Sequence, residues 1–306
     1  MKDLVLTSLV QLGGNNPSDQ EPRKAYCTSF FTSCLAWGNG LINHLGVFYL
    51  IVLVPLCVLL GSAPSLAEVR TEVVEYRQGE TILEGYLAYD DEITTQRPGV
   101  LVVHAWKGLG ENEKERAKQL AQLGYVAFAA DIYGKGIRPQ TAKEAAAQAK
   151  IYRSDRQLMR DRANAGLRFL QQHPLTTRDR LAAIGYCFGG GVVLELARSG
   201  TPIAGVVSFH GNLDTPNPRD ARYIQGRVLV LHGADDPLVP DEQVLAFQQE
   251  MRQGNVDWQM VVYGGAVHSF TDPNAGNDPA RGVAYIKGKY FPACRSDANP
   301  ADSKGS

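Results

Sequence analysis

Cys187 is the residue whose surroundings most clearly favour chemistry. It stands in the segment 185–189, GYCFG, directly after an apolar run at 181–184. This spacing matches the strand-to-helix turn G-x-S-x-G, which exposes a nucleophile at the tip of a strand, with cysteine in place of serine. A thiolate at that point lies at the positive end of a helix dipole, which lowers its pKa below the free value of about 8.5. Taken by itself, the motif is equally typical of a small core cysteine in a glycine-rich turn.

An acid and a histidine follow the cysteine along the chain. Asp236 comes shortly after an apolar run at 228–232, and His268 comes shortly after a run at 258–263. Nucleophile, acid and histidine in this order are typical of α/β-hydrolase triads. Read singly, Asp236 could be a turn residue or helix cap, and His268 a surface imidazole. The three together, each at the end of its own strand, favour a Cys-Asp-His triad.

Alternating strands and helices are predicted to position these residues. Strands are expected at 72–77, 81–88, 100–104, 126–130, 181–186, 203–209, 228–232 and 258–263, and helices at 113–123, 142–152, 155–172, 188–199 and 241–253. Apolar strands separated by helices predict an α/β fold with a mostly parallel central sheet and helices on both faces. In such a sheet, reactive side chains gather at the carboxyl ends of the strands.

The segment 1–67 is predicted to lie outside this fold. Residues 25–67 contain no Lys, Arg, Asp or Glu, and Leu45–Leu60 is mostly apolar. That run is short for a membrane span, which needs about 20 residues. Its length suits the apolar core of a signal peptide, and Ser65-Leu66-Ala67 supplies the small residues of a cleavage site. We expect an export segment with a long N-terminal extension and a periplasmic or secreted mature chain from Glu68; a membrane anchor at Leu45–Leu60 is the alternative.

Composition excludes several classes of function. The 306 residues carry 31 basic and 32 acidic side chains, so there is no basic field to hold a nucleic acid. Five cysteines are too few for a disulfide scaffold in a chain of this length. No run of residues has the spacing of a metal site or of a phosphate-binding glycine loop. We therefore expect neither a metal nor a nucleotide cofactor.

Several motifs together resemble the dienelactone hydrolase (carboxymethylenebutenolidase) family of the α/β-hydrolase superfamily. They are HAWKG at 104–108, DIYGK at 131–135, GYCFGG at 185–190, SFHG at 208–211, GADDPLVP at 233–240, GGAVHSF at 264–270 and GVAY at 282–285. The resemblance spans about 68–285, so we expect a hydrolase domain at 68–291 and a polar tail at 292–306. It implies a catalytic triad of Cys187, Asp236 and His268. Asp236 is preferred to Asp235 because it has the family's spacing to Pro240.

The resemblance also implies a reaction. His268, oriented by Asp236, would take the proton of the Cys187 thiol, and the thiolate would attack the carbonyl of a small ester or lactone. Backbone N–H groups of Phe188 and Trp106 would form the oxyanion hole, and water would release the acyl-enzyme. Two other functions stay open: a catalytically silent binding protein on the same fold, and an acyl transferase that uses the same triad.

The sequence departs from the family pattern at two places. Ala105 stands where dienelactone hydrolases carry a glutamate that takes part in activating the thiol, and Glu111 is the acid nearby in the sequence. After Tyr285 the chain runs into the polar tail, where family members form a final amphipathic helix. Lys107 and Lys135 are expected to flank the cleft, which predicts a preference for anionic substrates.

Overall fold

The computed structural model describes residues 69–278 and 283–284. The export segment predicted at 1–67, the tail at 292–306 and the final helix expected of the family all lie outside the described residues. The described residues belong to one compact unit. None of the helices formed by these residues is long and apolar enough to cross a membrane.

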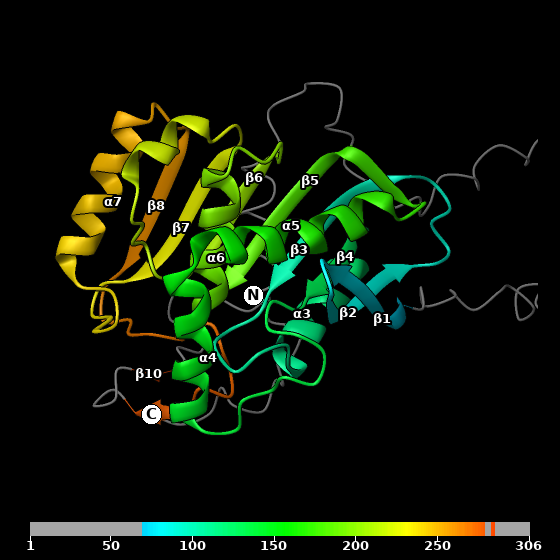
Figure 1. Cartoon of the computed structure of the whole chain (residues 1–306), viewed down its shortest axis with the longest axis horizontal. Helices are drawn as coiled ribbons and strands as arrows, with labels where there is room; N and C mark the ends of the chain where they lie inside the picture. The colour runs from blue at the N-terminus through cyan, green and yellow to red at the C-terminus, as the bar shows by residue number, and fades with distance from the viewer. Residues whose placement is uncertain (1–68, 279–282, 285–306) are drawn as a thin grey trace, which may run out of the picture. The chain divides into compact units, whose positions relative to one another are not determined.

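An eight-stranded sheet forms the centre of the fold (Figure 1). Its strands are β1 (Val69–Gln78), β2 (Thr81–Asp90), β3 (Arg97–Val103), β4 (Val126–Ala130), β5 (Thr176–Tyr186), β6 (Gly205–Phe209), β7 (Arg227–Gly233) and β8 (Trp258–Tyr263). They lie in the order β1-β2-β4-β3-β5-β6-β7-β8. β2 pairs antiparallel with β1 and with β4, and the other neighbours are parallel. The α/β class and the mostly parallel sheet predicted from the sequence are confirmed.

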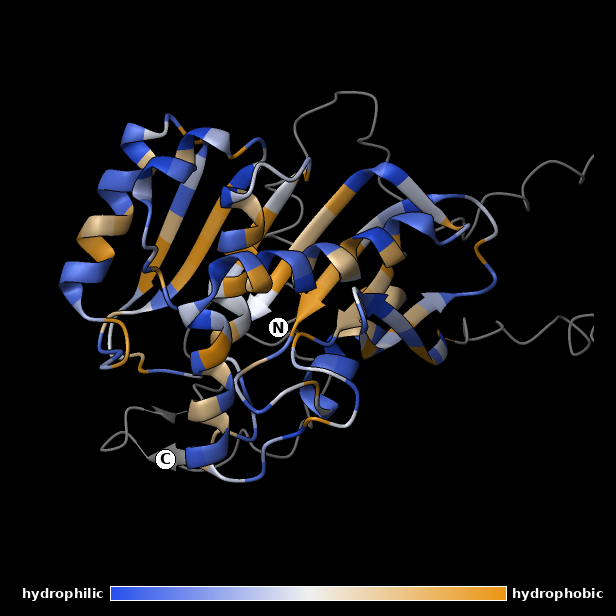
Figure 2. Cartoon of the chain, in the orientation of Figure 1, coloured by the Kyte–Doolittle hydropathy of each residue, from blue (hydrophilic) through white to orange (hydrophobic). Residues whose placement is uncertain are grey.

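Helices cover both faces of the sheet. They are α3 (Glu111–Gln122), α4 (Ala142–Ser154), α5 (Arg156–Gln172), α6 (Phe188–Arg198) and α7 (Asp241–Gln253). Figure 1 shows α5 and α6 in front of the central strands. One apolar cluster joins the sheet to α5, α6 and α7, and a second joins it to α3. Because both faces are covered, β4 and β6 are buried along their whole length, and the central strands are strongly apolar (Figure 2).

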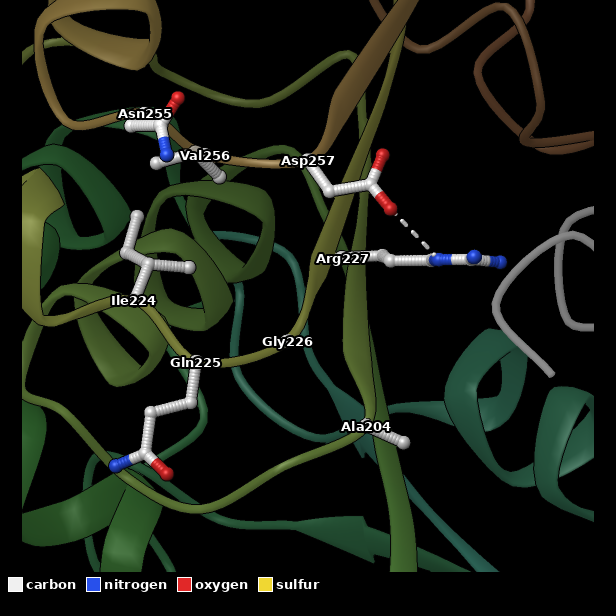
Figure 3. Close-up of a pocket in the computed structure, with 8 residues that line it drawn as sticks. All are labelled: Ala204, Ile224, Gln225, Gly226, Arg227, Asn255, Val256 and Asp257. Carbon is white, nitrogen blue, oxygen red and sulfur yellow. Dashed lines mark ion pairs between the residues drawn. The ribbon is translucent and has the colours of Figure 1, made fainter. Parts of the chain in front are cut away.

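The sheet brings the predicted reactive residues to one edge. Cys187 follows β5, and Asp236 and His268 come shortly after β7 and β8, so all three lie at carboxyl ends of parallel strands. The pocket drawn in Figure 3 lies at the opposite edge, where β6, β7 and β8 begin. Its lining includes Arg227 and Asp257, whose side chains form an ion pair at 2.8 Å. That pocket is therefore separate from the candidate site.

Candidate active site

Cys187 occupies a strained turn between β5 and α6. Its φ of 54° lies in the left-handed region, which side chains other than glycine seldom adopt. A Cβ atom placed on Gly185 would overlap the carbonyl oxygen of Gly189, and one on Gly189 would overlap the carbonyl oxygen of Val103. Glycine is therefore required on both sides of the cysteine. This close approach is the physical reason for the G-x-C-x-G spacing.

Asp236 and His268 form a buried pair. His268 Nδ1 donates to Asp236 Oδ2 at 2.8 Å, and both side chains are almost fully buried. The other carboxylate oxygen, Oδ1, accepts the N–H of Leu238 at 2.9 Å, which fixes the acid in its loop. The neighbouring Asp235 is exposed. The structure thus brings Asp236, and not Asp235, to the histidine.

The charges of Cys187 and His268 act on one another. Burial by itself raises the pKa of Cys187. Three effects oppose it: the charge of His268, the His268 ring N–H as a donor, and the backbone N–H of Phe188. The net result is a pKa below the usual value of a cysteine. Burial lowers the pKa of His268, and the charges of Cys187 and Asp236 outweigh this and raise the pKa to about 10. His268 Nε2 makes no hydrogen bond of normal geometry within the described residues. Each side chain therefore favours the charged form of the other.

A second histidine packs against His268. The ring centroid of His210, just after β6, lies 5.2 Å from that of His268, and its Nε2 lies 2.8 Å from Thr271 Oγ1. Burial holds the pKa of His210 well below its usual value. His210 is therefore neutral and adds no positive charge beside the imidazolium. We assign it a packing role.

The two backbone N–H groups predicted to form the oxyanion hole follow β5 and β3, which are neighbouring strands of the sheet. The Phe188 N–H begins α6 and acts on the thiol, lowering its pKa. Trp106 follows β3, the neighbour of β5, and its carbonyl accepts the hydroxyl of Tyr133 at 2.9 Å. Among the described residues, no acceptor occupies the Trp106 N–H. Tyr133 is buried close enough to Cys187 for the thiolate charge to raise its pKa, although burial is the larger cause.

The two lysines predicted to flank the cleft are both exposed. Lys135 pairs with Glu75 of β1, and both side chains are exposed. Lys107 is exposed on the loop before α3. Apart from His268, the cation that lowers the pKa of Cys187 is Arg153 of α4, which also donates to Asn212 Oδ1.

Sequence reasoning missed two residues near this site, Tyr133 and Glu113, and discounted a third, Arg153, as a solvated surface charge. Tyr133 lay within the quoted DIYGK motif, but its hydroxyl contact could not be read from that motif. Glu113 stands three residues after Gly110, a spacing typical of a helix-capping carboxylate, and that signal was available. The contact of Arg153 left no signal, because its partner Asn212 lies far along the chain. No cluster of potential metal ligands occurs among the described residues.

Comparison with known proteins places this site in a family. The profile of the Dienelactone hydrolase family matches residues 83–291. The chain belongs to the dienelactone hydrolase family. Its mostly parallel eight-stranded sheet is that of an α/β-hydrolase of this family, as the resemblance implied.

The relatives include a curated protein and solved structures. A Bradyrhizobium protein named "Probable 2-oxo-3-(5-oxofuran-2-ylidene)propanoate lactonase" is 29% identical over 189 residues, covering 58% of this chain and 75% of the relative. The structure of a dienelactone hydrolase-like promiscuous phosphotriesterase from metagenomic libraries is 43% identical with a TM-score of 0.69, covering 72% of this chain and 91% of that one. A dienelactone hydrolase from Anabaena variabilis, 21% identical with a TM-score of 0.52 over 68% of this chain and 91% of that one, shares the fold. These likenesses indicate a dienelactone hydrolase-like hydrolase.

Proposed function

We propose that this protein hydrolyses a small carboxylic ester or lactone through a triad of Cys187, Asp236 and His268. The observation that carries the proposal is the buried 2.8 Å contact between Asp236 Oδ2 and His268 Nδ1. It lies at the same end of the sheet, at the carboxyl ends of the parallel strands, as the strained turn of Cys187. A cysteine whose pKa is lowered by a neighbouring imidazolium is a nucleophile ready to attack at neutral pH. This supports an enzyme over a silent binding protein.

The proposed reaction has two steps. The Cys187 thiolate forms a bond to the carbonyl carbon, while the N–H groups of Phe188 and Trp106 hold the oxyanion. The carbon–oxygen bond to the leaving group then breaks, and His268 gives its Nε2 proton to the departing alkoxide. Water attacks the resulting thioester as His268 takes a proton back. The carboxylic acid leaves, and the thiolate–imidazolium pair is restored.

Substrate charge is proposed to be read by Arg153. Its guanidinium is exposed and lies near enough to Cys187 to affect the thiol, whereas Lys135 is occupied by Glu75. A substrate carboxylate beside the cleft would therefore meet Arg153 first. Lys107, which is exposed on the loop that carries Trp106, is a weaker candidate, because its charge is not among those that act on Cys187.

A phosphotriester is the second candidate substrate. The relative that is 43% identical to this chain is described as a promiscuous phosphotriesterase. The same thiolate could attack phosphorus and expel an aryloxide, with the two N–H groups holding the phosphoryl oxygen. Comparing an aryl ester with an aryl phosphotriester measures which reaction this site favours.

Export remains part of the proposal. It is supported by the uncharged stretch at 25–67 and by the small residues at 65–67, as set out above. N-terminal sequencing of a periplasmic or secreted fraction tests it, and the expected first residue is Glu68. A secreted protein that keeps residues before Leu45 would contradict cleavage at this place.

Intact-protein mass spectrometry with p-nitrophenyl acetate tests the catalytic proposal. We expect one acetyl adduct on the wild-type protein and none on Cys187→Ala. Asp235→Asn is the matched control, since that carboxylate is exposed beside the triad acid, and it should acylate at the wild-type rate. Decay of the adduct in water supports a hydrolase, and decay only with an added alcohol or thiol supports a transferase. Full esterase activity in Cys187→Ala would refute the mechanism.

A further inference from the structure

Glu113 is a buried acid that the proposed triad does not use. Its side chain is 3% exposed, although it lies in the first turn of α3. One carboxylate oxygen accepts the N–H of Ala105 at 3.3 Å, and the other accepts the N–H of Gly110 at 3.1 Å. A buried carboxylate needs such donors, because burial without them costs several kcal/mol. The two donors are backbone groups of one loop.

That loop is the oxyanion loop, residues 105–110. Ala105 lies at its start and Gly110 at its end, so Glu113 ties both ends to α3. Trp106, which presents the proposed oxyanion-hole N–H, follows Ala105 directly. The two oxygens of one carboxylate thus define the distance between the loop ends.

Further contacts fix the peptide that joins Ala105 to Trp106. The carbonyl of Ala105 accepts the N–H of Gly108 at 3.1 Å and lies 2.7 Å from His104 Nδ1. The carbonyl of Trp106 accepts the Tyr133 hydroxyl. With its neighbours held on both sides, the Trp106 N–H has one orientation. The Glu113 contact is the one that links this orientation to a helix.

Glu111, the acid closest to this loop by sequence reasoning, has a different place. Its side chain is exposed and pairs with Lys114 at 2.7 Å on the same helix. It does not contact the oxyanion loop in any hydrogen bond of the described residues. The two acids stand two residues apart on one helix turn, one buried against the loop and one facing solvent. They form a natural matched pair.

We propose that Glu113 is a positioning residue that holds the oxyanion loop so that the Trp106 N–H meets the developing oxyanion, an inference that rests on the proposed function. Glu113 touches no substrate. It acts through the backbone of Ala105 and Gly110. Misplacing a group in an active site by about 1 Å can cost about 100-fold in rate, so loss of this tether should be visible in acylation.

The role is distinct from activation of the thiol. The groups that lower the pKa of Cys187 are led by His268, with Phe188 and Arg153 after it. Alkylation by iodoacetamide needs the thiolate but forms no oxyanion. Acylation by an ester needs both. The ratio of the two rates therefore separates positioning of the oxyanion hole from thiol reactivity and from general damage to the fold.

The experiment compares Glu113→Gln with Glu111→Gln in the full-length protein. The amide of glutamine keeps the shape of Glu113 but turns one acceptor into a donor, so it cannot accept both N–H groups. We expect acylation by p-nitrophenyl acetate to fall about 10- to 100-fold, within the range for losing an oxyanion-hole donor. Alkylation of Cys187 should change less than about twofold. Glu111→Gln should change neither rate.

Other outcomes overturn the inference. Wild-type acylation in Glu113→Gln would show that the tether is not needed, and an equal fall in alkylation would show that Glu113 acts on the thiol or the fold. If Glu113→Gln does not fold, Glu113→Asp retains the charge and is too short to reach both donors. It should slow acylation at least fivefold relative to alkylation, and an unchanged ratio would refute the proposal. Failure of the triad itself is seen separately, as esterase activity in Cys187→Ala.

Discussion

In the proposed mechanism, the reactivity of Cys187 depends on its charge pair with His268. The net effect of burial and neighbouring charge is a lowered pKa for the thiol and a raised pKa for the imidazole. A free thiol with a pKa of about 8.5 is less than about 1% ionised at pH 6. The paired cysteine should hold a larger thiolate fraction than a free thiol at the same pH. At this scale the predictions concern protons.

Replacing His268 should move the pH dependence of alkylation upward. In His268→Ala, burial still raises the pKa of Cys187 and the largest opposing charge is gone. We expect the midpoint of the iodoacetamide rate to lie at higher pH in His268→Ala than in the wild-type protein, by more than about one unit. A stopped-time alkylation series from pH 5 to 10 measures this. An unshifted midpoint would mean that His268 does not stabilise the thiolate.

Ester hydrolysis should decline at high pH. The imidazolium of His268 must give a proton to the leaving group, and its pKa is raised to about 10. Above that pH the ring is deprotonated, so the hydrolysis rate should fall as the pH rises through about 10. A pH profile of kcat/KM checks this limb, with alkylation, which needs no proton donor, as the control. A profile still rising beyond pH 11 would contradict the assignment of this pKa to His268.

Elements on the sheet face with α5, α6 and α7 are joined by a buried ion-pair cluster. Arg198 of α6 binds both carboxylate oxygens of Glu250 of α7 at 2.8 Å and lies 3.1 Å from Glu195. All three side chains are almost fully buried. The arginine also donates to the carbonyl of Leu213, so one side chain connects two helices and a loop. Buried charges of this kind become costly when one partner is removed.

Arg198→Ala should lower the free energy of unfolding by about 3–5 kcal/mol, because the buried Glu250 would lose its cationic partner, while Glu195 would keep Arg160. Denaturant unfolding followed by circular dichroism measures the change. Arg70→Ala is the control, since Arg70 pairs with Glu72 at the protein surface and should leave stability unchanged. A loss no larger than that of the control would show that the cluster contributes little.

The sequence predicts elements better than it predicts contacts between them. β4, α7 and β8 have the predicted bounds, because buried apolar runs and an amphipathic helix each leave a periodic signal. The short 3₁₀ helix at Pro218–Tyr223 and the two-residue strands β9 (Asn277–Asp278) and β10 (Val283–Ala284) were missed, since so few residues carry no period.

The candidate site divides in the same way. Cys187, Asp236 and His268 could be proposed because each stands in its own motif at a strand end. The places of Lys135, Glu113 and Arg153 could not, because they depend on Glu75, Ala105 and Asn212, partners on other elements or loops. Side chains that reach across elements leave little local pattern to read.

On the scale of the whole molecule, the hydrolase domain should be independent of the segment before it. β1 begins at Val69 and pairs with β2 from its first residue, where Val69 faces Asp90. A chain that starts at Glu68 should therefore melt at the same Tm as the full-length protein and hydrolyse p-nitrophenyl acetate with the same kcat/KM. Calorimetry and esterase assays on the two proteins check this. A lower Tm for the shortened chain would show that residues 1–67 contribute to the fold.

The position of β8 at the edge of the sheet links the ionisation of Cys187 to the formation of that strand. Within residues 69–278, β8 pairs only with β7 and leads into the loop of His268, so the proposed base follows the last strand of the sheet. During synthesis, Cys187 is added to the chain before β8 and His268. Until His268 is in place, the thiol has no imidazolium beside it to favour the thiolate. In a nascent chain, the thiol of Cys187 should therefore be less ionised than in the folded protein. If β8 opens locally in the folded protein, His268 should be displaced with it. The thiol of Cys187 should then lose its charge partner while the other strands stay paired.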